Sequence, residues 1–159
     1  MQHLSLAPFY QGWGSHQQHL VQALAPLTNE DLAYSVIPRW SVGRIAAHIC
    51  AARIWWFHVR MGEGSMELAP MEHWDGAAQP ARSAEELVNG LERSWHIIES
   101  ALARWTPADL EHVFPARSND PTERTRQWII WHVMEHDIHH GGELSCILGM
   151  YGLPPVELE

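Results

Sequence analysis

Hydrophobic residues recur along this chain at alternating steps of three and four positions, in four separate stretches. Because each residue of an α-helix advances about 100° around the axis, such steps keep the side chains on one face. No stretch shows the period of two that is typical of a half-buried strand. The pattern predicts an all-α protein built as a four-helix bundle. The predicted helices cover residues 5–25, 41–61, 83–105 and 121–152.

Capping residues mark several of the predicted helix starts. Ser41 is a good N-cap for the second helix, and Ser83-Ala-Glu-Glu forms a capping box for the third. The segment Asp120-Pro121-Thr122-Glu123 has a capping acid, a proline at the first helical position and a glutamate at the third, which predicts the start of the last helix. Thr28, with acids behind it, predicts one short helical turn.

Residues 62–82 contain Gly, Pro and Met without a clear period, and they separate the second and third helices. When extended, about 20 residues span roughly 60 Å, whereas the second helix is about 30 Å long. The linker can therefore run the length of the bundle, and it predicts a long crossover between parallel second and third helices. Because irregular segments of this length are often functional, we expect it to form a wall or lid of a pocket.

The last helix carries two histidines on the face that the period assigns to the core. His136 and His140 lie four residues apart, so their rings stack on one side of the helix within reach of a common point. A buried imidazole must be hydrogen-bonded or bound to something, and two on one apolar stripe suggest a metal ion. The stripe consists of Ile129, Val133, His136, His140, Leu144, Ile147 and Tyr151.

A third ligand would complete a metal site of the catalytic type, because three neutral imidazoles around Zn²⁺ or a similar ion leave positions open for water or substrate. His48 is the first candidate, because it flanks the apolar face in the middle of the second helix. His16, in the apolar seam of the first helix, is the alternative. His132 and His139 lie beside the pair and could orient ligands or line the pocket.

Other residues of these helices have environments that the period predicts. Glu143 lies three residues beyond the histidine pair, as either a hydrogen-bond acceptor or a solvated acid. Gly141 costs its helix about 1 kcal/mol relative to Ala, and close packing against another helix is the usual compensation. His58 points away from the apolar face and is predicted to be exposed. Cys50 and Cys146 lie in apolar helical stretches, which predicts free thiols in the core.

The composition excludes several classes of partner. Ten basic residues against nineteen acidic ones give a net charge of −9, which argues against a nucleic-acid surface and an anionic membrane surface. There is no run of about 18 apolar residues and no basic region followed by an apolar one at the N-terminus. We therefore expect a cytoplasmic protein that acts on a small molecule. At 159 residues, the chain fits one domain spanning 1–159.

Two segments resemble a known family. The segment His132-Val-Met-Glu-His136-Asp-Ile-His139-His140, followed by Gly142 and Glu143, resembles the closing helix of the DinB/YfiT superfamily of metalloenzymes. The segment Trp40-Ser-Val-Gly-Arg-Ile-Ala-Ala-His48 resembles the second helix of that family, where one metal-binding histidine occurs. The resemblance implies a DinB-like four-helix bundle with a long second crossover. It also implies one metal site, with the ligands His48, His136 and His140.

The resemblance also implies a range of activities. Members of the family include thiol S-transferases that use bacillithiol, mycothiol or glutathione, and a mycothiol-dependent maleylpyruvate isomerase, and dimers are common among them. This chain departs from the family pattern at Gly141, where a basic residue is frequent, and at Glu143, where glutamine is frequent. The departures leave the metal ligands in place but alter any contact that the basic residue makes with substrate or thiol. A homodimer is the assembly that the resemblance suggests.

Three functions are compatible with these residues. The first is a transferase acting on a low-molecular-weight thiol, because a divalent cation such as zinc or nickel, held by neutral ligands, would favour the thiolate nucleophile. The second is a metal-dependent hydrolase, with water in place of the thiol. The third is a stress-related protein that binds a metal or ligand without turnover. Glu143 and His132 are the candidates for an acid or base beside the metal.

Overall fold

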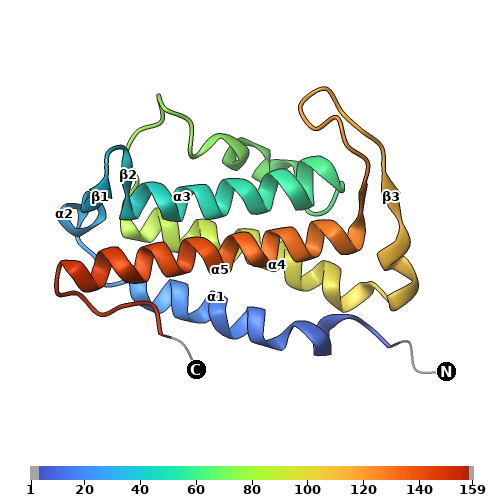
Figure 1. Cartoon of the computed structure of the whole chain (residues 1–159), viewed down its shortest axis with the longest axis horizontal. Helices are drawn as coiled ribbons and strands as arrows, with labels where there is room; N and C mark the ends of the chain where they lie inside the picture. The colour runs from blue at the N-terminus through green and yellow to red at the C-terminus, as the bar shows by residue number, and fades with distance from the viewer. Residues whose placement is uncertain (1–3, 158–159) are drawn as a thin grey trace.

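Four long helices dominate the computed structural model, which describes residues 4–157 and is mostly helical (Figure 1). Figure 1 shows them side by side along the long axis of the molecule, and α1 and α3 each pack against both α4 and α5. Their apolar side chains meet in one core. The predicted all-α class is therefore confirmed as a mostly helical fold. The four helices are α1 (Gln11–Leu24), α3 (Val42–Arg53), α4 (Ala84–Arg104) and α5 (Arg126–Met150).

Side-chain caps fix where three of the helices begin. The hydroxyl of Ser41 accepts a backbone N–H from the first turn of α3. Ser83 and Glu86 form the predicted capping box at the start of α4, and Thr28 caps the short helix α2 (Asn29–Leu32). Each cap satisfies backbone N–H groups that the first turn of a helix leaves without a partner. A further short segment, the 3₁₀ helix η1 (Ala7–Tyr10), precedes α1.

The last helix begins later than the sequence predicts. Thr125, not Asp120, is the N-cap of α5. Asp120 is instead buried, and its Oδ2 lies 3.4 Å from Nε of Arg60, which is buried as well. A buried guanidinium without a carboxylate would cost more than one lost helix cap, so the ion pair determines where Asp120 lies. The residues before α5 form a hairpin of β3 (Val113–Phe114) and β4 (Arg124–Thr125).

A second short hairpin precedes α3 and has no signal in the hydrophobic pattern. Strand β1 (Ser35–Ile37) pairs with the antiparallel strand β2 (Trp40–Ser41). Strands of two or three residues are too short to show a period of two. In the turn between them Arg39 has a φ of 66°, a left-handed conformation that is costly for a residue with a Cβ. The hairpin places Trp40 beside the first turn of α3.

The second predicted helix, residues 41–61, is covered by two elements with different hydrogen bonding. Helix α3 ends at Arg53, and the π-helical segment η2 (Ile54–Arg60) continues it. Segments of this kind are rare and frequently occur at functional sites. Here the π-helical segment presents two half-buried tryptophans, Trp55 and Trp56.

Residues 62–82 pass along α3 before α4 begins (Figure 1). They contain a 3₁₀ segment, η3 (Met66–His73), that packs against α3 and η2. Trp74 then packs against Gly90 of α4, where a Cβ would lie 2.4 Å from ring atom Cζ3 of Trp74. The glycine therefore allows the linker to approach α4 closely. A further 3₁₀ segment, η4 (Pro107–Glu111), follows α4.

Three predicted environments are wrong. Cys146 is exposed, although Cys50 is buried as predicted, and both are free thiols. Tyr151, placed by the period at the end of the core stripe, is 45% exposed. His58 is half-buried rather than exposed, because its Nδ1 lies 2.6 Å from the carbonyl oxygen of Glu63. The helical period assigns faces, but it does not tell how far along a helix other segments cover each face.

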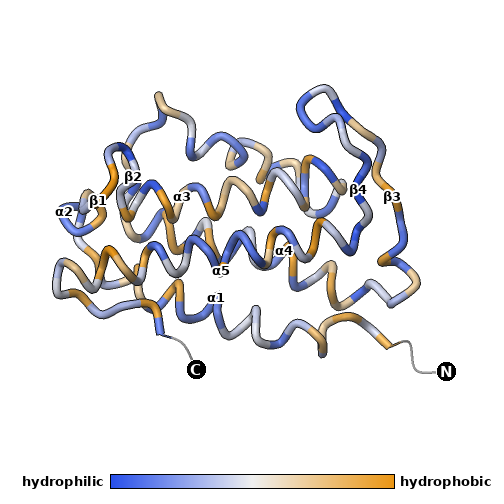
Figure 2. Tube along the Cα trace, viewed as in Figure 1, coloured by the Kyte–Doolittle hydropathy of each residue, from blue (hydrophilic) through white to orange (hydrophobic). Residues whose placement is uncertain are grey.

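The middle of α5 is hydrophilic, although the helix packs against the core. Figure 2 shows this polar stretch in the middle of α5, between turns that carry more hydrophobic residues. It contains His136 and His140. In the part of the chain that the structure describes, no helix is long and apolar enough to cross a membrane.

Candidate metal centre

Three histidines from two helices come together between α3 and α5. His136 and His140 lie one turn apart on α5, and His48 faces them from α3. The Nε2 atoms of His136 and His48 are 3.0 Å apart. The ring centroid of His140 lies 4.3 Å from that of His136 and 4.8 Å from that of His48. One nitrogen of each ring lies within 4.8 Å of the other two, so the structure brings together the three predicted ligands.

Carboxylates contact two of the three imidazoles at Nδ1, the ring nitrogen that is left over when Nε2 serves as a ligand. Nδ1 of His48 lies 2.7 Å from Oδ2 of Asp75, and Nδ1 of His140 lies 2.6 Å from Oε2 of Glu143. An imidazole that donates its Nδ1–H to a carboxylate keeps a lone pair on Nε2, an arrangement that is common behind metal-bound histidines. These hydrogen bonds therefore leave Nε2 of both rings available as a ligand atom.

The residues present fit a bound cation. Two Nε2 lone pairs 3.0 Å apart, on His48 and His136, repel each other unless a proton or a cation lies between them. Zn–N bonds of about 2.0–2.1 Å in tetrahedral geometry separate two ligand nitrogens by about 3.4 Å, so a small adjustment would admit an ion. Nδ1 of His136 is buried and has no hydrogen-bond partner in residues 4–157, so no hydrogen bond of that atom opposes such an adjustment.

Burial keeps the imidazoles of His136 and His140 neutral. Burial, together with the neighbouring His140 and His48, lowers the pKa of His136 to about 3. Burial also lowers the pKa of His140, against the opposing effect of its hydrogen bond to Glu143. Histidine binds a metal only in its neutral form. At neutral pH these side chains are therefore nitrogen donors rather than cations.

Glu143 is a hydrogen-bond acceptor, which decides between the two roles that the sequence left open. Its Oε2 accepts the Nδ1–H of His140 and, at 2.9 Å, the indole N–H of Trp40. Burial raises the pKa of Glu143, but these hydrogen bonds outweigh burial and lower the pKa overall. The indole ring of Trp40 also lies edge-on to His48, with ring centroids 5.2 Å apart. Glu143 and Trp40 thus support two of the three imidazoles.

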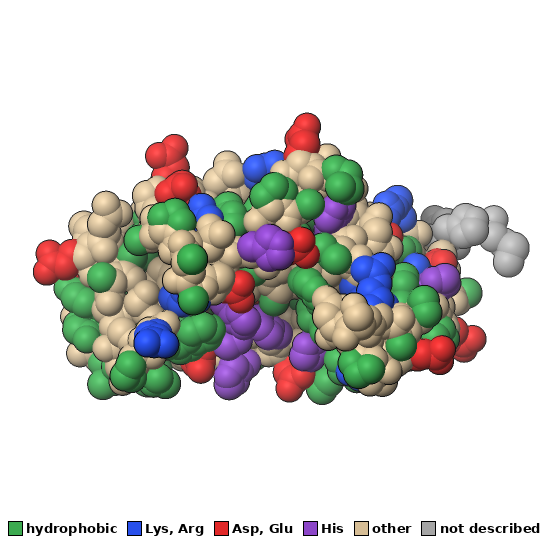
Figure 3. All heavy atoms as spheres, turned by 90° about the horizontal axis from the view of Figure 1, so that it is seen from above, with side chains coloured by type: hydrophobic (Ala, Val, Ile, Leu, Met, Phe, Trp, Pro, Cys, Tyr) green, Lys and Arg blue, Asp and Glu red, His purple; other side chains and the backbone are tan. Residues whose placement is uncertain are grey.

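A cleft of about 270 Å³ gives access to the cluster. Figure 3 shows histidine side chains gathered in a hollow between two raised parts of the surface. The linker 62–82 contributes to the cleft, as predicted for this segment. The lining residues are His48, Ala51, Ala52, Trp55, Trp56, Glu72, Asp75, His132 and His136. A small molecule can therefore reach the cluster from solvent, past tryptophan and histidine rings.

The flanking histidines of α5 differ in their surroundings. His132 lines the cleft, which is one of the two roles that the sequence left open for it, and its ring centroid lies 6.3 Å from that of His136. His139 is exposed, with Nε2 3.5 Å from Oε1 of Glu143. His139, His140 and Glu143 form a second group that could hold an ion, but it shares His140 with the first group.

His16, the alternative third ligand, is not among the histidines that converge. Its Nε2 lies 3.1 Å from the backbone carbonyl oxygen of Asp137. The ring packs so closely on α5 that a Cβ at Gly141 would lie 2.6 Å from Cε1 of His16. The expected close packing at Gly141 is therefore present, and it lets α1 approach α5.

A second polar cluster, missed in the sequence, is fully buried. Oδ2 of Asp137 lies 2.8 Å from Nη2 and 2.9 Å from Nε of Arg53. The indole N–H of Trp13 donates to the same oxygen at 2.7 Å, and Oε1 of Gln17 accepts from Arg53 at 2.6 Å. The helical period did indicate that Asp137 is buried, because it lies one turn from the buried residues Val133 and His140 of α5. Asp75 was missed as well, because it lies in the linker, where no period exists.

The fold and the cluster define a class of mostly helical proteins with three histidines converging between two helices. The chain belongs to the DinB family, whose family model matches residues 1–159. Among curated proteins, none matches the chain.

Solved structures share the fold. A DinB-like protein from Bacillus cereus has a TM-score of 0.73 at 22% sequence identity, covering 99% of this chain and 100% of that one. A conserved protein from Enterococcus faecalis has a TM-score of 0.65 at 15% identity, covering 88% and 93% of the two chains. A mycothiol-dependent maleylpyruvate isomerase has a TM-score of 0.56 at 15% identity, covering 86% of this chain and 60% of that chain. At such identities the likeness establishes the fold alone.

Proposed function

We propose that this protein binds one divalent metal ion, zinc or nickel, through the Nε2 atoms of His48, His136 and His140. The observation that carries the proposal is the convergence of nitrogens from the three rings. Asp75 and Glu143 support it, because each takes the outer nitrogen of one ring and leaves Nε2 available. Three imidazole ligands suit zinc and nickel.

We also propose that the site is held by a four-helix bundle, with residues 62–82 as a long crossover between α3 and α4. The packing of α1 and α3 against both α4 and α5 supports the bundle. The course of the linker along α3 supports the crossover. Side chains from facing helices of a bundle commonly build a metal site in its core, and here α3 and α5 supply all three imidazoles.

For the activity we propose the metal-dependent transfer of a low-molecular-weight thiol. A divalent ion held by three neutral imidazoles would supply positive charge that lowers the pKa of a thiol and favours the thiolate nucleophile. Three protein ligands leave a position for a small molecule, and the cleft of about 270 Å³ provides space beside His48 and His136. The shared fold of a mycothiol-dependent isomerase is consistent with thiol chemistry on this scaffold.

The side chains around the cleft have separate roles in this proposal. The carboxylates behind the rings orient the imidazoles and raise the basicity of Nε2. Trp55 and Trp56 offer aromatic surface to the apolar part of an electrophile. Burial lowers the pKa of His132, so its imidazole is neutral at pH 7 and can accept the proton that the thiol releases.

A metal-dependent hydrolase is the second candidate, and the position of His132 favours it. The side chain lines the same cleft as His136, with 6.3 Å between the ring centroids. A neutral imidazole at this distance can accept a proton from a water molecule in the cleft. The two candidates therefore use the same cluster and differ in the nucleophile.

Metal content tests the proposed site. Protein purified without a His tag should contain about one zinc or nickel ion per chain, and His136→Ala should remove it. His96→Ala is the matched control, because His96 is exposed on α4. No binding by the unaltered protein at micromolar metal would refute the site.

Activity assays then separate the functions. The metal-loaded protein is incubated with bacillithiol, mycothiol or glutathione and a chlorinated aromatic electrophile, and separately with a chromogenic ester. A thioether product that requires the metal and His136 supports the transferase. Ester hydrolysis that requires the metal and is weakened in His132→Ala supports the hydrolase. Metal binding with neither activity would favour a binding protein without turnover.

A further inference from the structure

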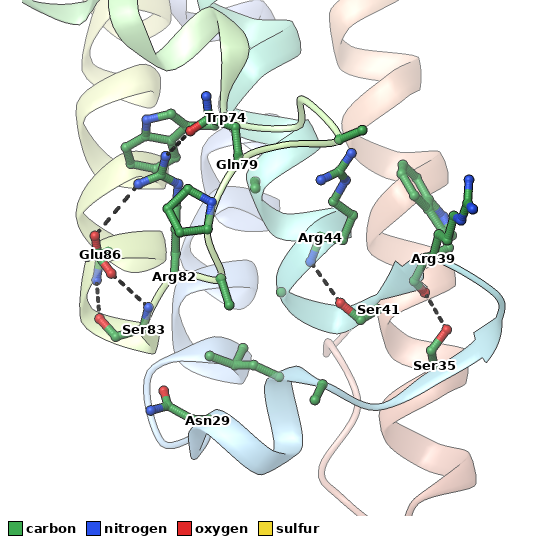
Figure 4. Close-up of a pocket in the computed structure, with 18 residues that line it drawn as sticks. Asn29, Ser35, Arg39, Ser41, Arg44, Trp74, Gln79, Arg82, Ser83 and Glu86 are labelled. Atoms are coloured by element: carbon green, nitrogen blue, oxygen red, sulfur yellow. Dashed lines mark hydrogen bonds and ion pairs between the residues drawn. The ribbon is translucent and has the colours of Figure 1, made fainter.

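A cavity of about 1100 Å³ lies among the hairpin β1–β2, the start of α3 and the segment that leads into α4 (Figure 4). It borders Trp40, which also contacts the metal centre, but His48, His136 and His140 do not line it. A volume of this size accommodates a molecule as large as a typical cofactor. The cavity is therefore a second space, adjacent to the histidine cluster and separate from the cleft described above.

The charges around this cavity are opposite in sign to that of the whole chain. The chain carries a net charge of −9, whereas the charged side chains lining the cavity are Arg39, Arg44, Arg82 and Glu86. The carboxylate of Glu86 already has partners, since it caps α4 and its Oε1 lies 3.7 Å from Nη1 of Arg82. No carboxylate in residues 4–157 forms an ion pair with Arg39 or Arg44. Two positive charges thus remain to be balanced.

Arg44 is held in position with donors to spare. Its Nη1 donates to the carbonyl oxygen of Gly76 at 3.0 Å, and Nε and Nη2 have no hydrogen-bond partner in the described part of the chain. A guanidinium binds a carboxylate or phosphate through two parallel hydrogen bonds. Arg44 also lies in the first turn of α3, where the helix dipole favours an anion. The position of Arg44, its unpaired donor groups and the dipole of α3 therefore all favour an anionic ligand.

Arg39 lies at the edge of the same cavity, in a backbone conformation that arginine adopts at a cost. Its φ is 66° and it follows Pro38 in the hairpin turn, a position that favours glycine or asparagine. The side chain is exposed and makes no hydrogen bond or ion pair within residues 4–157. A strained residue whose side chain has no use inside the protein is a candidate for contact with a ligand.

The cavity also offers aromatic surface beside these charges. Trp40 and Trp74 both line it. The guanidinium of Arg82 lies 4.0 Å from the ring centroid of Trp74, so one face of that indole is held in place. Figure 4 shows Trp74 and Arg82 on one side of the cavity, with Arg44 and Arg39 across from them. An occupant can thus pack an apolar part against an indole while its anionic group reaches the arginines.

We propose that this cavity binds a small anionic molecule through a carboxylate or phosphate group that Arg44 holds and Arg39 covers. The apolar part of the molecule packs against Trp40 and Trp74. None of the proposed metal ligands contributes, so binding does not require the ion. Because Trp40 also donates to Glu143, an occupant of the cavity touches a side chain that supports the metal centre.

Titration of the full-length, metal-free protein with succinate and with inorganic phosphate, at constant ionic strength, tests the proposal and distinguishes the two anionic groups. The indole N–H signals of Trp40 and Trp74 report on the cavity in NMR spectra. Saturable shifts with succinate alone identify a carboxylate site, and shifts with phosphate alone identify a phosphate site. Shifts with both, in mutual competition, identify a site for either group. The absence of saturable binding of both anions overturns the proposal.

Variants locate the binding. Arg44→Gln should weaken it about tenfold or more, as expected for lost hydrogen bonds to a charged group. Arg39→Gln should weaken it severalfold and leave the fold intact, because its side chain has no partner in the described structure. Arg93→Gln removes the same charge from an exposed position on α4 and should leave the affinity unchanged. Equal weakening in Arg93→Gln and Arg39→Gln would contradict the assignment.

His136→Ala makes this result independent of the proposed metal site. The variant should bind the anion with unchanged affinity while losing the metal. If the cavity binds nothing but the metal content of the unaltered protein is as proposed, only the cavity assignment fails. If the anion binds and the metal does not, only the metal site fails.

Discussion

Two neighbouring residues of α5, His136 and Asp137, belong to polar clusters that are built in opposite ways. Asp137 is fully buried, and its Oδ2 receives hydrogen bonds from Arg53 and Trp13. At His136 the nitrogens of three rings converge instead, and two of those rings use their hydrogen bonds on carboxylates outside the cluster. The first cluster joins two opposite charges through hydrogen bonds, whereas the second brings the acceptor nitrogens of three rings together.

The difference separates a structural role from a binding role on the same helix. In a buried ion pair the two charges neutralise each other, and removing one partner leaves the other charge uncompensated. A group of neutral imidazoles beside a cleft is completed only by a proton or a cation. A rotation of about 100° between consecutive residues therefore places a core ion pair next to a candidate metal centre. Substitutions at Asp137 should therefore change the stability of the fold, whereas substitutions at His136 should change metal binding.

The largest effect is expected at the three imidazoles. Replacing His48, His136 or His140 by Ala should weaken metal affinity by about three orders of magnitude, because each substitution removes one of three ligands. Since tenfold in affinity corresponds to about 1.4 kcal/mol, the expected loss of binding free energy is about 4 kcal/mol. Competition with a chelator of known affinity measures the change. The variants should unfold at a denaturant concentration close to that of the unaltered protein after its metal has been removed, because a bound metal would itself stabilise the fold. A loss of affinity below tenfold at all three positions would contradict the assignment.

Asp137→Ala should have the opposite profile. It should lower the free energy of unfolding by about 3–5 kcal/mol, because the guanidinium of Arg53 would remain buried without its partner. Urea titration followed by circular dichroism measures this change. Glu135→Ala is the control, since Glu135 is exposed on the same helix. Molecules of the Asp137 variant that remain folded should still bind the metal. An equal loss of stability in the Glu135 control would show that the buried ion pair is not responsible for the effect.

A smaller effect is expected from the acids behind the rings. Asp75→Ala should weaken metal affinity about 10–100-fold, because it removes the acceptor that orients His48. Glu72→Ala is the matched control, because Glu72 also lines the cleft but forms no hydrogen bond or ion pair with the clustered rings in residues 4–157. The same chelator competition applies. Equal effects of the two substitutions would show that the charge of the linker, rather than the hydrogen bond, is responsible.

The helices could be predicted from the sequence because their signals are local. Ser41 and Ser83 cap the helices that they were expected to cap, and the period assigned most of the core. The start of α5 could not be predicted in this way. Asp120 has every local property of an N-cap, but it pairs with Arg60, which is sixty positions earlier. The two short hairpins contain too few residues for any period to appear.

The same distinction applies to the candidate site. His136 and His140 were identifiable because four-residue spacing on a helix dictates a shared face, and His48 because it flanks an apolar stripe and because of the family resemblance. Asp75 comes from an irregular segment, so its contact with His48 depends on the tertiary path of the linker. Asp137 lies one turn from core positions of the same helix, but its buried charge is compensated by Arg53 of another helix, a pairing that no local pattern in the sequence encodes.

Acidification should lower the free energy of unfolding of the metal-free protein, because several of its histidines are held neutral by burial. Burial lowers the pKa of His136 to about 3 and also lowers the pKa of His16 and His132. Since these folded-state pKa values lie below those of the unfolded chain, the unfolded chain takes up protons first as the pH falls. Stability is therefore present in full above about pH 6.5 and declines toward pH 3. Urea titrations between pH 7.5 and 5 measure the slope, which should be shallower in His136→Ala.

The smallest effect on metal binding is expected at His16, which adjoins the Asp137 cluster rather than the imidazole cluster. Its hydrogen bond to the carbonyl oxygen of Asp137 and its packing against Gly141 are structural contacts. His16→Ala should therefore lower the free energy of unfolding by about 1 kcal/mol and leave the metal affinity unchanged within about twofold. His19→Ala, on the same helix, is the control for stability. If His16→Ala abolished metal binding while His48→Ala left it intact, the ion would lie between α1 and α5. The division of α5 into a structural side and a binding side would then have to be reversed.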